Sequence, residues 1–207
     1  MPRPHLLYVA WGFPPSRGSG VYRALATANA FAEAGWDITV LTAPREVFIE
    51  LFGADLSLEA RIHPAIRVRH VRQDLPHIDP DLASWSRARV ASEPAWFSAF
   101  NRASERDFPE RVYGGWAKNL RAAADQVHSA HPVDLVLGTA NPNVDFVPGE
   151  HLHRSHGVPY VLDYRDGWAL DVTTGNRSSA EGTRAWRRGL SLLEDTEEAW
   201  FVNEPIR

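Results

Sequence analysis

The stretch LLYVAW (residues 6–11), GFPPSRGSG (residues 12–20), VYRALATANAFAEA (residues 21–34) and DITVLT (residues 37–42) decides the fold. The first and last runs are apolar, as buried β-strands are, and between them small and apolar residues recur at helical spacing. A glycine after the helical run is a typical helix stop signal. Strand, glycine loop, helix and strand predict a βαβ unit. Its loop lies at the carboxyl end of the first strand, where open α/β sheets bind ligands.

Length and composition fit one large globular domain. The chain has 207 residues, of which 44% are hydrophobic and 23% charged, and it is long enough to bury a core. A net charge of −4 gives no reason to expect a nucleic-acid partner. The absence of cysteine excludes disulfides, a cysteine nucleophile and thiolate metal sites. With no secretory-signal pattern and no apolar run long enough to span a bilayer, we expect a cytoplasmic protein without a transmembrane segment.

Strand and helix patterns alternate along the rest of the chain. Expected strands cover residues 66–71 (exposed or at an edge), 134–139, 160–164 and 199–203. Expected helices cover residues 112–130, 148–156 and 180–196, with a partly helical stretch at 46–52. Strands separated by helices predict an α/β, Rossmann-like, doubly wound and mostly parallel sheet with helices on both faces.

Residues 73–111 interrupt this alternation. They are rich in proline and poor in periodicity, so we expect a mobile, loop-rich insertion with short helices around residues 82–90 and 96–103. Its aromatic residues are Trp85, Trp96, Phe97 and Phe100. Packing beneath a long loop is one interpretation. The alternative is that they cover a lipid-linked acceptor or make peripheral contact with the inner face of a membrane.

A second informative run is YVLDYRDGW (residues 160–168), a buried-strand pattern that ends in charge. Alternation along a strand places Asp163 and Arg165 on one face and Tyr164 and Asp166 on the other, unless the strand ends first. A carboxylate at a strand end can accept a hydrogen bond from a substrate hydroxyl or orient a sugar. Asp163 and Asp166 are therefore the candidate catalytic residues, and Arg165 is a candidate substrate-binding residue. The alternative is an Arg–Asp pair that only fixes the loop.

The glycine loop is a candidate anion site. Gly18, Ser19 and Gly20 precede a helix, so their backbone N–H groups can approach phosphate oxygens at its N-terminus; the alternative is a tight turn. Arg23 either adds a cation to that site or pairs with Asp163 or Asp166. It also stands where a dinucleotide-binding fingerprint requires its third glycine, and no acidic residue ends the second strand. The pattern therefore disfavours NAD binding.

The loop after residues 134–139 contains two more candidates. Asn141 and Asn143 lie at the carboxyl end of that strand, and their amides suit sugar hydroxyls as well as turns. The nearby trio His151, His153 and His156 does not indicate a metal site. On a helix only the last two share a face, and no further ligand stands at metal spacing.

Several of these motifs resemble, in order and spacing, the N-terminal half of family-4 retaining glycosyltransferases. The resemblance rests on Phe13-Pro14-Pro15, the Gly18/Gly20 loop, Arg23, Ala34-Gly35-Trp36-Asp37, the strand after it, the run at 158–168 and the closing residues 200–207. It covers both ends and the middle of the chain and leaves out the insertion. Those enzymes have the GT-B fold, in which two Rossmann-like domains face each other across a cleft.

The resemblance implies that residues 1–207 are the acceptor-side domain, whose glycine loop approaches the donor's diphosphate. In that family the C-terminal domain holds the nucleotide sugar and supplies two glutamates eight positions apart. No two glutamates of this chain have that spacing. We therefore expect the donor-binding domain to be absent from this chain, which alone would be inactive.

The intact enzyme would transfer a hexosyl-type sugar from a nucleotide sugar to a hydroxyl of a sugar, a lipid-linked acceptor or a small molecule. We expect no cofactor and no dedicated metal site. One alternative is a self-contained nucleotide- or phosphate-binding module without catalysis. Another is an NAD-dependent or hydrolytic enzyme on the same fold.

Overall fold

The computed structural model describes residues 3–168 and 179–202, and the strands of this part form one six-stranded parallel sheet in the order β3-β2-β1-β4-β5-β6. The strands are β1 (His5–Val9), β2 (Asp37–Thr42), β3 (Ile66–His70), β4 (Leu135–Thr139), β5 (Tyr160–Tyr164) and β6 (Glu198–Phe201). The chain winds outward from β1 in one direction and then, from β4, in the other. The switch point between β1 and β4 is where a doubly wound sheet opens a crevice at its carboxyl edge.

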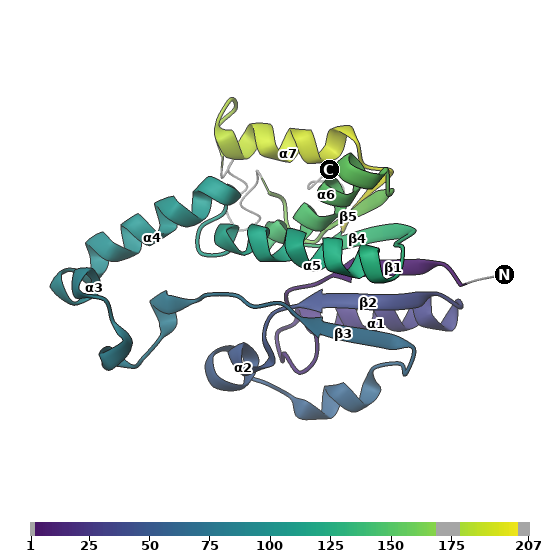
Figure 1. Ribbon diagram of the computed structural model, residues 1–207, viewed down its shortest axis with the longest axis horizontal. Helices are drawn as coiled ribbons and strands as arrows, with labels where there is room; N and C mark the ends of the chain where they lie inside the picture. Colours follow the sequence, from purple (N-terminus) through teal and green to yellow (C-terminus); the bar gives the residue numbers. More distant parts are fainter. Residues whose placement is uncertain (1–2, 169–178, 203–207) are drawn as a thin grey trace.

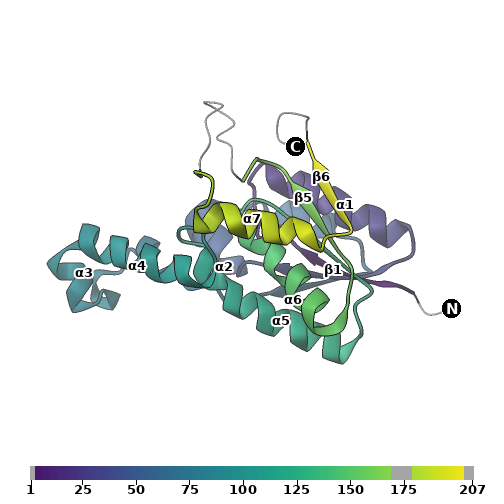
Figure 2. The same ribbon diagram turned by 90° about the horizontal axis from the view of Figure 1, so that it is seen from above.

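Helices cover both faces of the sheet (Figures 1 and 2). Helix α1 (Gly20–Glu33) lies on one face, and α5 (Ala117–Ala130), α6 (Val147–His156) and α7 (Arg184–Glu194) lie on the other. Strand alternation produces the two layers. In β1, Leu6 and Tyr8 join the buried cluster that contains the apolar residues of α1, whereas Leu7 and Val9 join the cluster that contains those of α5. The predicted Rossmann-like α/β sheet with helices on both faces is confirmed.

Shorter elements connect these layers. They are α2 (Arg45–Val47), η1 (Phe48–Phe52), η2 (Leu56–Arg61), η3 (Pro76–Ile78), η4 (Leu82–Ser84), α3 (Arg87–Ala91), α4 (Glu93–Asp107), η5 (Gly114–Trp116) and η6 (Asn143–Phe146). None of the described helices is long and apolar enough to cross a membrane.

The predicted boundaries hold within a few residues, with one larger shift. The long helix expected at residues 112–130 begins at Ala117, because a short 3-10 turn occupies Gly114–Trp116. Glycine costs a helix interior about 1 kcal/mol relative to alanine, so a helix starting after the Gly114-Gly115 pair is physically reasonable. Helix α7 is shorter than expected at both ends, and β3 lies at the sheet edge as predicted.

The insertion is more helical than its sequence predicts. We expected short helices, but α4 is a continuous helix of 15 residues. Together, η3, η4, α3 and α4 form an arm that projects from the sheet in both views (Figures 1 and 2). Only Asn101 and Ser104 of α4 are buried. The helix therefore has no apolar stripe of the kind that reveals a helix in sequence.

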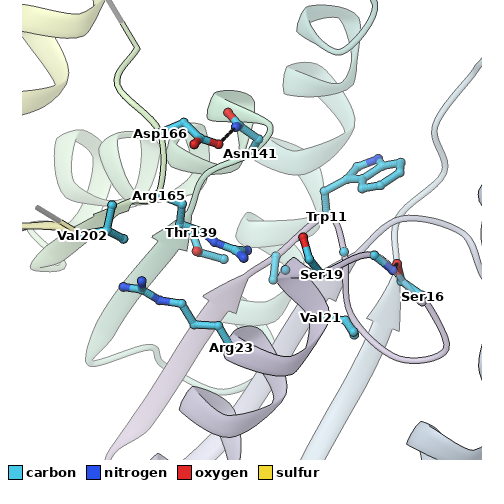
Figure 3. Close-up of a pocket in the computed structure, with 14 residues that line it drawn as sticks. Trp11, Ser16, Ser19, Val21, Arg23, Thr139, Asn141, Arg165, Asp166 and Val202 are labelled. Atoms are coloured by element: carbon cyan, nitrogen blue, oxygen red, sulfur yellow. Dashed lines mark hydrogen bonds between the residues drawn. The ribbon is translucent and has the colours of Figure 1, made fainter. Parts of the chain in front are cut away.

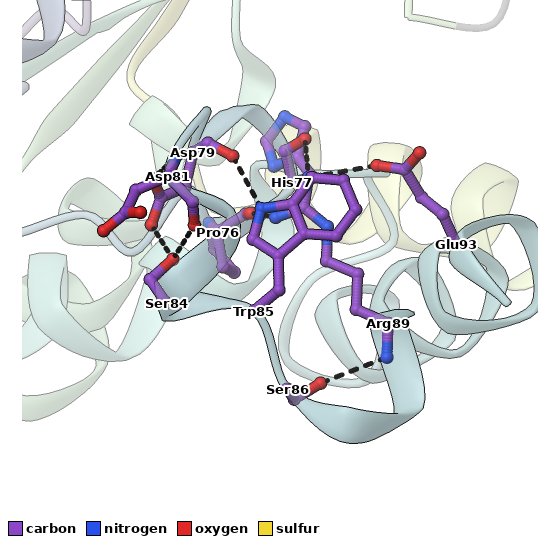
Figure 4. Close-up of polar contacts among 9 residues, drawn as sticks. All are labelled: Pro76, His77, Asp79, Asp81, Ser84, Trp85, Ser86, Arg89 and Glu93. Atoms are coloured by element: carbon purple, nitrogen blue, oxygen red, sulfur yellow. Dashed lines mark hydrogen bonds and ion pairs between the residues drawn. The ribbon is translucent and has the colours of Figure 1, made fainter. Parts of the chain in front are cut away.

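The arm has a small core of its own around Arg89 (Figure 4). The Arg89 side chain is almost fully buried, and its guanidinium donates to the carbonyls of Pro76 and His77 and to the carboxylate of Glu93. Its guanidinium carbon lies 3.5 Å from the centroid of the Trp85 ring, in cation–π contact. This arrangement supports the packing interpretation of the insertion's aromatic residues.

Two more of those aromatic residues, Trp96 and Phe100, extend this core. Trp96 stacks on Phe100, whose ring also stacks on His77, and Arg89 lies over Trp96 as well. Phe97 is 37% exposed. These contacts concern packing within the arm, and the alternative of membrane contact stays a prediction.

Candidate functional site

A cavity of about 520 Å³ opens at the carboxyl edge of the sheet, at the switch point (Figure 3). Its lining comes from the ends of β1 and β4, the glycine loop, the first turn of α1 and the segments after β5 and β6. The lining residues are Ala10, Trp11, Gly12, Ser16, Gly18, Ser19, Gly20, Val21, Arg23, Thr139, Asn141, Arg165, Asp166 and Val202. The predicted meeting of the glycine loop with the charged run after β5 at one edge is confirmed.

Arg165 lies across the start of α1. A Cβ atom built on Gly20 would stand 2.4 Å from Nη1 of Arg165 and 2.9 Å from its guanidinium carbon, so only glycine lets the guanidinium come this close. No side chain caps the first turn of α1, and that turn contains no acidic residue. The positive end of the helix dipole and the Arg165 cation therefore face the same cavity.

A buried carboxylate holds the second arginine. Nη2 of Arg23 donates to Oδ1 of Asp163 over 2.5 Å, and the Thr139 hydroxyl donates to Oδ2 over 2.8 Å. Asp163 is 2% exposed and does not line the cavity, whereas 40% of the Arg23 side chain is exposed. Arg23 thus pairs with Asp163 and also lines the cavity. It therefore combines the two roles that were predicted as alternatives, a partner of an aspartate and a cation of the anion site. Asp163 therefore positions Arg23 from outside the cavity.

The two asparagines of the loop after β4 have different surroundings. Nδ2 of Asn141 donates to Oδ2 of Asp166 over 2.5 Å, and both side chains line the cavity (Figure 3). Asn143 lies outside the lining. Its backbone N–H and its side-chain amide donate to Glu110 over 3.0 and 3.3 Å. Asn141 is therefore placed to contact a ligand, and Asn143 is engaged in holding the loop.

Sequence reasoning missed the groups that support this edge. Trp11 lines the cavity, its backbone N–H donates to Oδ2 of Asp145 over 2.6 Å, and its indole Nε1 donates to Gln73 over 2.7 Å. Asp145 is fully buried. Burial raises its pKa well above the ordinary value of 3.8, the Trp11 N–H opposes this shift, and the charge of Glu110 adds to it. A single acid in a helical pattern gives no sequence signal. The one indication in the sequence was that Trp11 directly precedes the glycine loop, which suggests that it lies beside the cavity.

No group of three potential metal ligands is found in the part of the chain that the structure describes. The histidines of α6 have separate partners. His151 contacts Asp125 at 2.7 Å, His153 contacts the carbonyl of Val158, and His156 stacks on His128.

The cavity therefore has two chemically different sides. Arg23, Arg165 and the start of α1 present positive charge, which suits a phosphate or diphosphate. Asn141 and Asp166 present amide and carboxylate groups, which suit hydroxyls.

No known family model matches the chain, and no curated protein matches its sequence. Among solved structures, the chain aligns over its full length with 41% of a protein described as a UDP-N-acetylglucosamine 2-epimerase from Listeria monocytogenes, at 9% identity and a TM-score of 0.49. It also aligns over 80% of its length with 28% of a Glycyrrhiza uralensis UGT73P12 structure, at 13% identity and a TM-score of 0.41. A UGT transferase from Siraitia grosvenorii gives 13% identity, coverage of 81% and 29%, and a TM-score of 0.40.

The chain thus spans less than half the length of each of these proteins. Likenesses of this degree concern the fold at most, so the chemistry has to be argued from the residues of the site itself.

Proposed function

We propose that this chain is the acceptor-side half of a retaining GT-B glycosyltransferase and that its carboxyl-edge cavity receives the diphosphate of a nucleotide sugar. One observation carries the proposal: two arginines and the uncapped start of α1 face one cavity at the switch point of the sheet. The sequence motifs that resemble family-4 enzymes, the glycine loop and the run at residues 158–168, both contribute residues to the lining of this cavity.

The positive side of the cavity matches a diphosphate in charge and in hydrogen-bonding geometry. A guanidinium donates two parallel hydrogen bonds to phosphate oxygens, and an open helix N-terminus offers backbone N–H groups to the same anion. Gly20 leaves room for both, because a side chain there would displace Arg165. Asp163 neutralises part of the charge of Arg23 but leaves its side chain accessible from the cavity.

The polar side of the cavity suits a hydroxyl acceptor. Asp166 is the candidate catalytic residue, because its carboxylate lines the cavity and can accept a hydrogen bond from the attacking hydroxyl. Asn141, which is bonded to Asp166, can donate to or accept from a neighbouring hydroxyl. The buried Asp163 acts on Arg23 and does not meet the substrate.

Glycosyl transfer breaks the bond between the anomeric carbon and the diphosphate. Negative charge then grows on the departing diphosphate while the sugar becomes oxocarbenium-like. Arg23, Arg165 and the α1 dipole would stabilise the growing negative charge, and such preorganised electrostatics are usually the largest catalytic contribution. In this proposal the remaining donor contacts come from a second domain, so residues 1–207 alone should not transfer a sugar.

Calorimetry with inorganic pyrophosphate tests the anion site on the chain itself. We expect weak binding by the wild type and a loss of about tenfold in Arg165→Ala, as removal of one charge-assisted hydrogen-bonding group typically produces. Arg17→Ala is the matched control, because Arg17 belongs to the same loop but does not line the cavity. Equal affinity in the wild type and Arg165→Ala would exclude this cavity as the anion site.

The same measurement with uridine and guanosine diphosphate sugars separates the proposal from its main alternative. A half-site should bind them weakly, because half of the contacts are missing. Micromolar affinity of residues 1–207 for a nucleotide sugar would instead favour a self-contained binding module.

A further inference from the structure

Glu110 connects the arm to the loop that carries Asn141. It follows α4 in sequence, and its carboxylate accepts three hydrogen bonds from the start of η6. Oε1 accepts from the backbone N–H of Asn143 over 3.0 Å and from its side-chain amide over 3.3 Å. Oε2 accepts from the backbone N–H of Val144 over 2.9 Å. One side chain thus holds two consecutive backbone N–H groups and one amide.

The held segment directly follows the part of the loop that lines the cavity. Asn141 lies two residues before Asn143, lines the cavity and donates to Asp166. Glu110 contacts neither Asn141 nor Asp166 in these hydrogen bonds and does not line the cavity. Any influence that it has on the site must therefore pass through the backbone of the loop.

The surroundings of Glu110 make this contact costly to lose. Burial raises the pKa of its carboxyl group, while the N–H groups of Asn143 and Val144 oppose the shift. Removing the carboxylate would leave these backbone donors without their acceptor in a partly buried place, and unsatisfied donors of that kind are strongly unfavourable. The loop would then move to find another acceptor.

We propose that Glu110 is a positioning residue of the cavity, which acts through the loop to keep Asn141 against Asp166 and thereby ties the root of the arm to the site. The consequence for ligand affinity rests on the proposed function; the consequence for the position of Asn141 does not. Glu110 itself takes no part in the chemistry.

NMR of the ligand-free, isotope-labelled chain tests the position of Asn141 directly. We expect Glu110→Ala to shift the side-chain amide signal of Asn141 and the backbone signal of Asp166. Glu110→Gln keeps one acceptor oxygen and a similar size, so it should shift them less. Glu105→Ala is the matched control, because Glu105 lies near the same end of α4 and its carboxylate pairs with Arg111 instead. If Glu110→Ala does not fold, Glu110→Gln decides the test by the same comparison with Glu105→Ala.

A double-mutant cycle tests the route of the effect, with the backbone NMR signal of Asp166 as its readout. Glu110→Ala should shift this signal in the wild-type background and by much less in an Asn141→Ala background, because directly coupled residues are not additive. A purely structural role would shift the signal equally in both backgrounds, and that result would overturn the proposal.

The proposed function and the positioning role of Glu110 are contradicted by different results. If the wild type does not bind pyrophosphate, the proposed function is contradicted while the NMR comparison still decides the role of Glu110. If Glu110→Ala shifts only Asn143 and Val144 and leaves Asn141 and Asp166 unchanged, the positioning role is excluded whatever the cavity binds.

Discussion

Arg23 owes its place in the cavity to a carboxylate that no ligand can reach. Asp163 is buried, accepts from Thr139 and from Arg23, and so fixes one end of the guanidinium while the rest stays accessible. Sequence reasoning identified Asp163 and Asp166 together as catalytic candidates. Burial separates them, because only Asp166 lines the cavity. Alternation along the strand predicted opposite faces for Arg165 and Asp166, but β5 ends at Tyr164 and both residues line the cavity. The depth of each side chain depends on packing that a single strand does not reveal.

Replacing Asp166 with asparagine tests the catalytic role that we propose for it in an intact glycosyltransferase. The change keeps size and an acceptor oxygen for Asn141 but removes the charge. We expect turnover to fall by about two orders of magnitude, as loss of a positioned acid–base or electrostatic group does, with little change in melting temperature. Unchanged turnover with a lower melting temperature would make Asp166 a loop-fixing residue instead.

Asp145 makes stability depend on pH in a defined direction. Its pKa in the folded chain lies well above the ordinary 3.8. Between those two pKa values the folded state binds more protons than the unfolded state, so stability falls as pH rises. Relative to Asp145→Asn, the wild type should lose up to about 1.4 kcal/mol of unfolding free energy per pH unit in that window.

Urea denaturation of both proteins at a series of pH values measures this difference. Asp74→Asn is the control substitution, because 67% of the Asp74 side chain is exposed. A wild type that gains stability relative to Asp145→Asn as pH rises would show instead that folding favours the charged form of Asp145.

At the level of elements, the start of α1 and the end of β5 form one unit. Gly20 opens the helix, and the guanidinium of Arg165, one residue beyond β5, lies against it. The sequence predicted that these two segments share an edge. The need for glycine at position 20 is a finding of the structure, because it depends on a side chain from a strand far along the chain.

Gly20→Ala should therefore weaken anion binding without harming the fold. Alanine is the better helix former, so stability should stay equal or rise. Its Cβ would displace Arg165, and pyrophosphate affinity should fall several-fold. Gly189→Ala is the control, since Gly189 lies within α7, does not line the cavity, and a Cβ there meets its nearest neighbour, Cδ2 of Trp168, at 4.0 Å. Equal affinity in Gly20→Ala and the wild type would show that the position of Arg165 is unimportant for the anion.

The arm is the element that sequence patterns describe least well. Helix α4 buries almost none of its length, so apolar periodicity could not define its ends. The buried Arg89 packs between two tryptophan rings and holds the arm together. No local sequence pattern predicts this contact. Its predicted mobility stays a prediction.

Hydrogen exchange tests both the mobility of the arm and the role of Arg89. Amides of residues 73–111 should exchange faster than those of the sheet, and Arg89→Ala should accelerate them further because the arm's small core is lost. Arg87→Ala, at an exposed neighbour on α3, should leave them unchanged. Exchange across the arm as slow as in β1 would show a rigid insertion and contradict its predicted mobility.

At the scale of the whole molecule, the sheet was the most predictable part. Buried apolar runs such as residues 37–42 have one physical explanation in a chain that alternates strands and helices, and the sheet order follows the doubly wound arrangement. The cavity's position follows from that arrangement. Its supporting acids, Glu110 and Asp145, could not be predicted, because each contacts a segment that only the complete fold brings near it.

The location of a bound diphosphate tests the central claim most directly. NMR signals of the labelled chain can be followed during addition of UDP. The account predicts shifts at Gly18, Ser19 and Gly20 and at the side chains of Arg23 and Arg165, with none at the opposite edge of the sheet, before β2 and β5. Shifts confined to that opposite edge, or no shift at the glycine loop at saturating UDP, would contradict it.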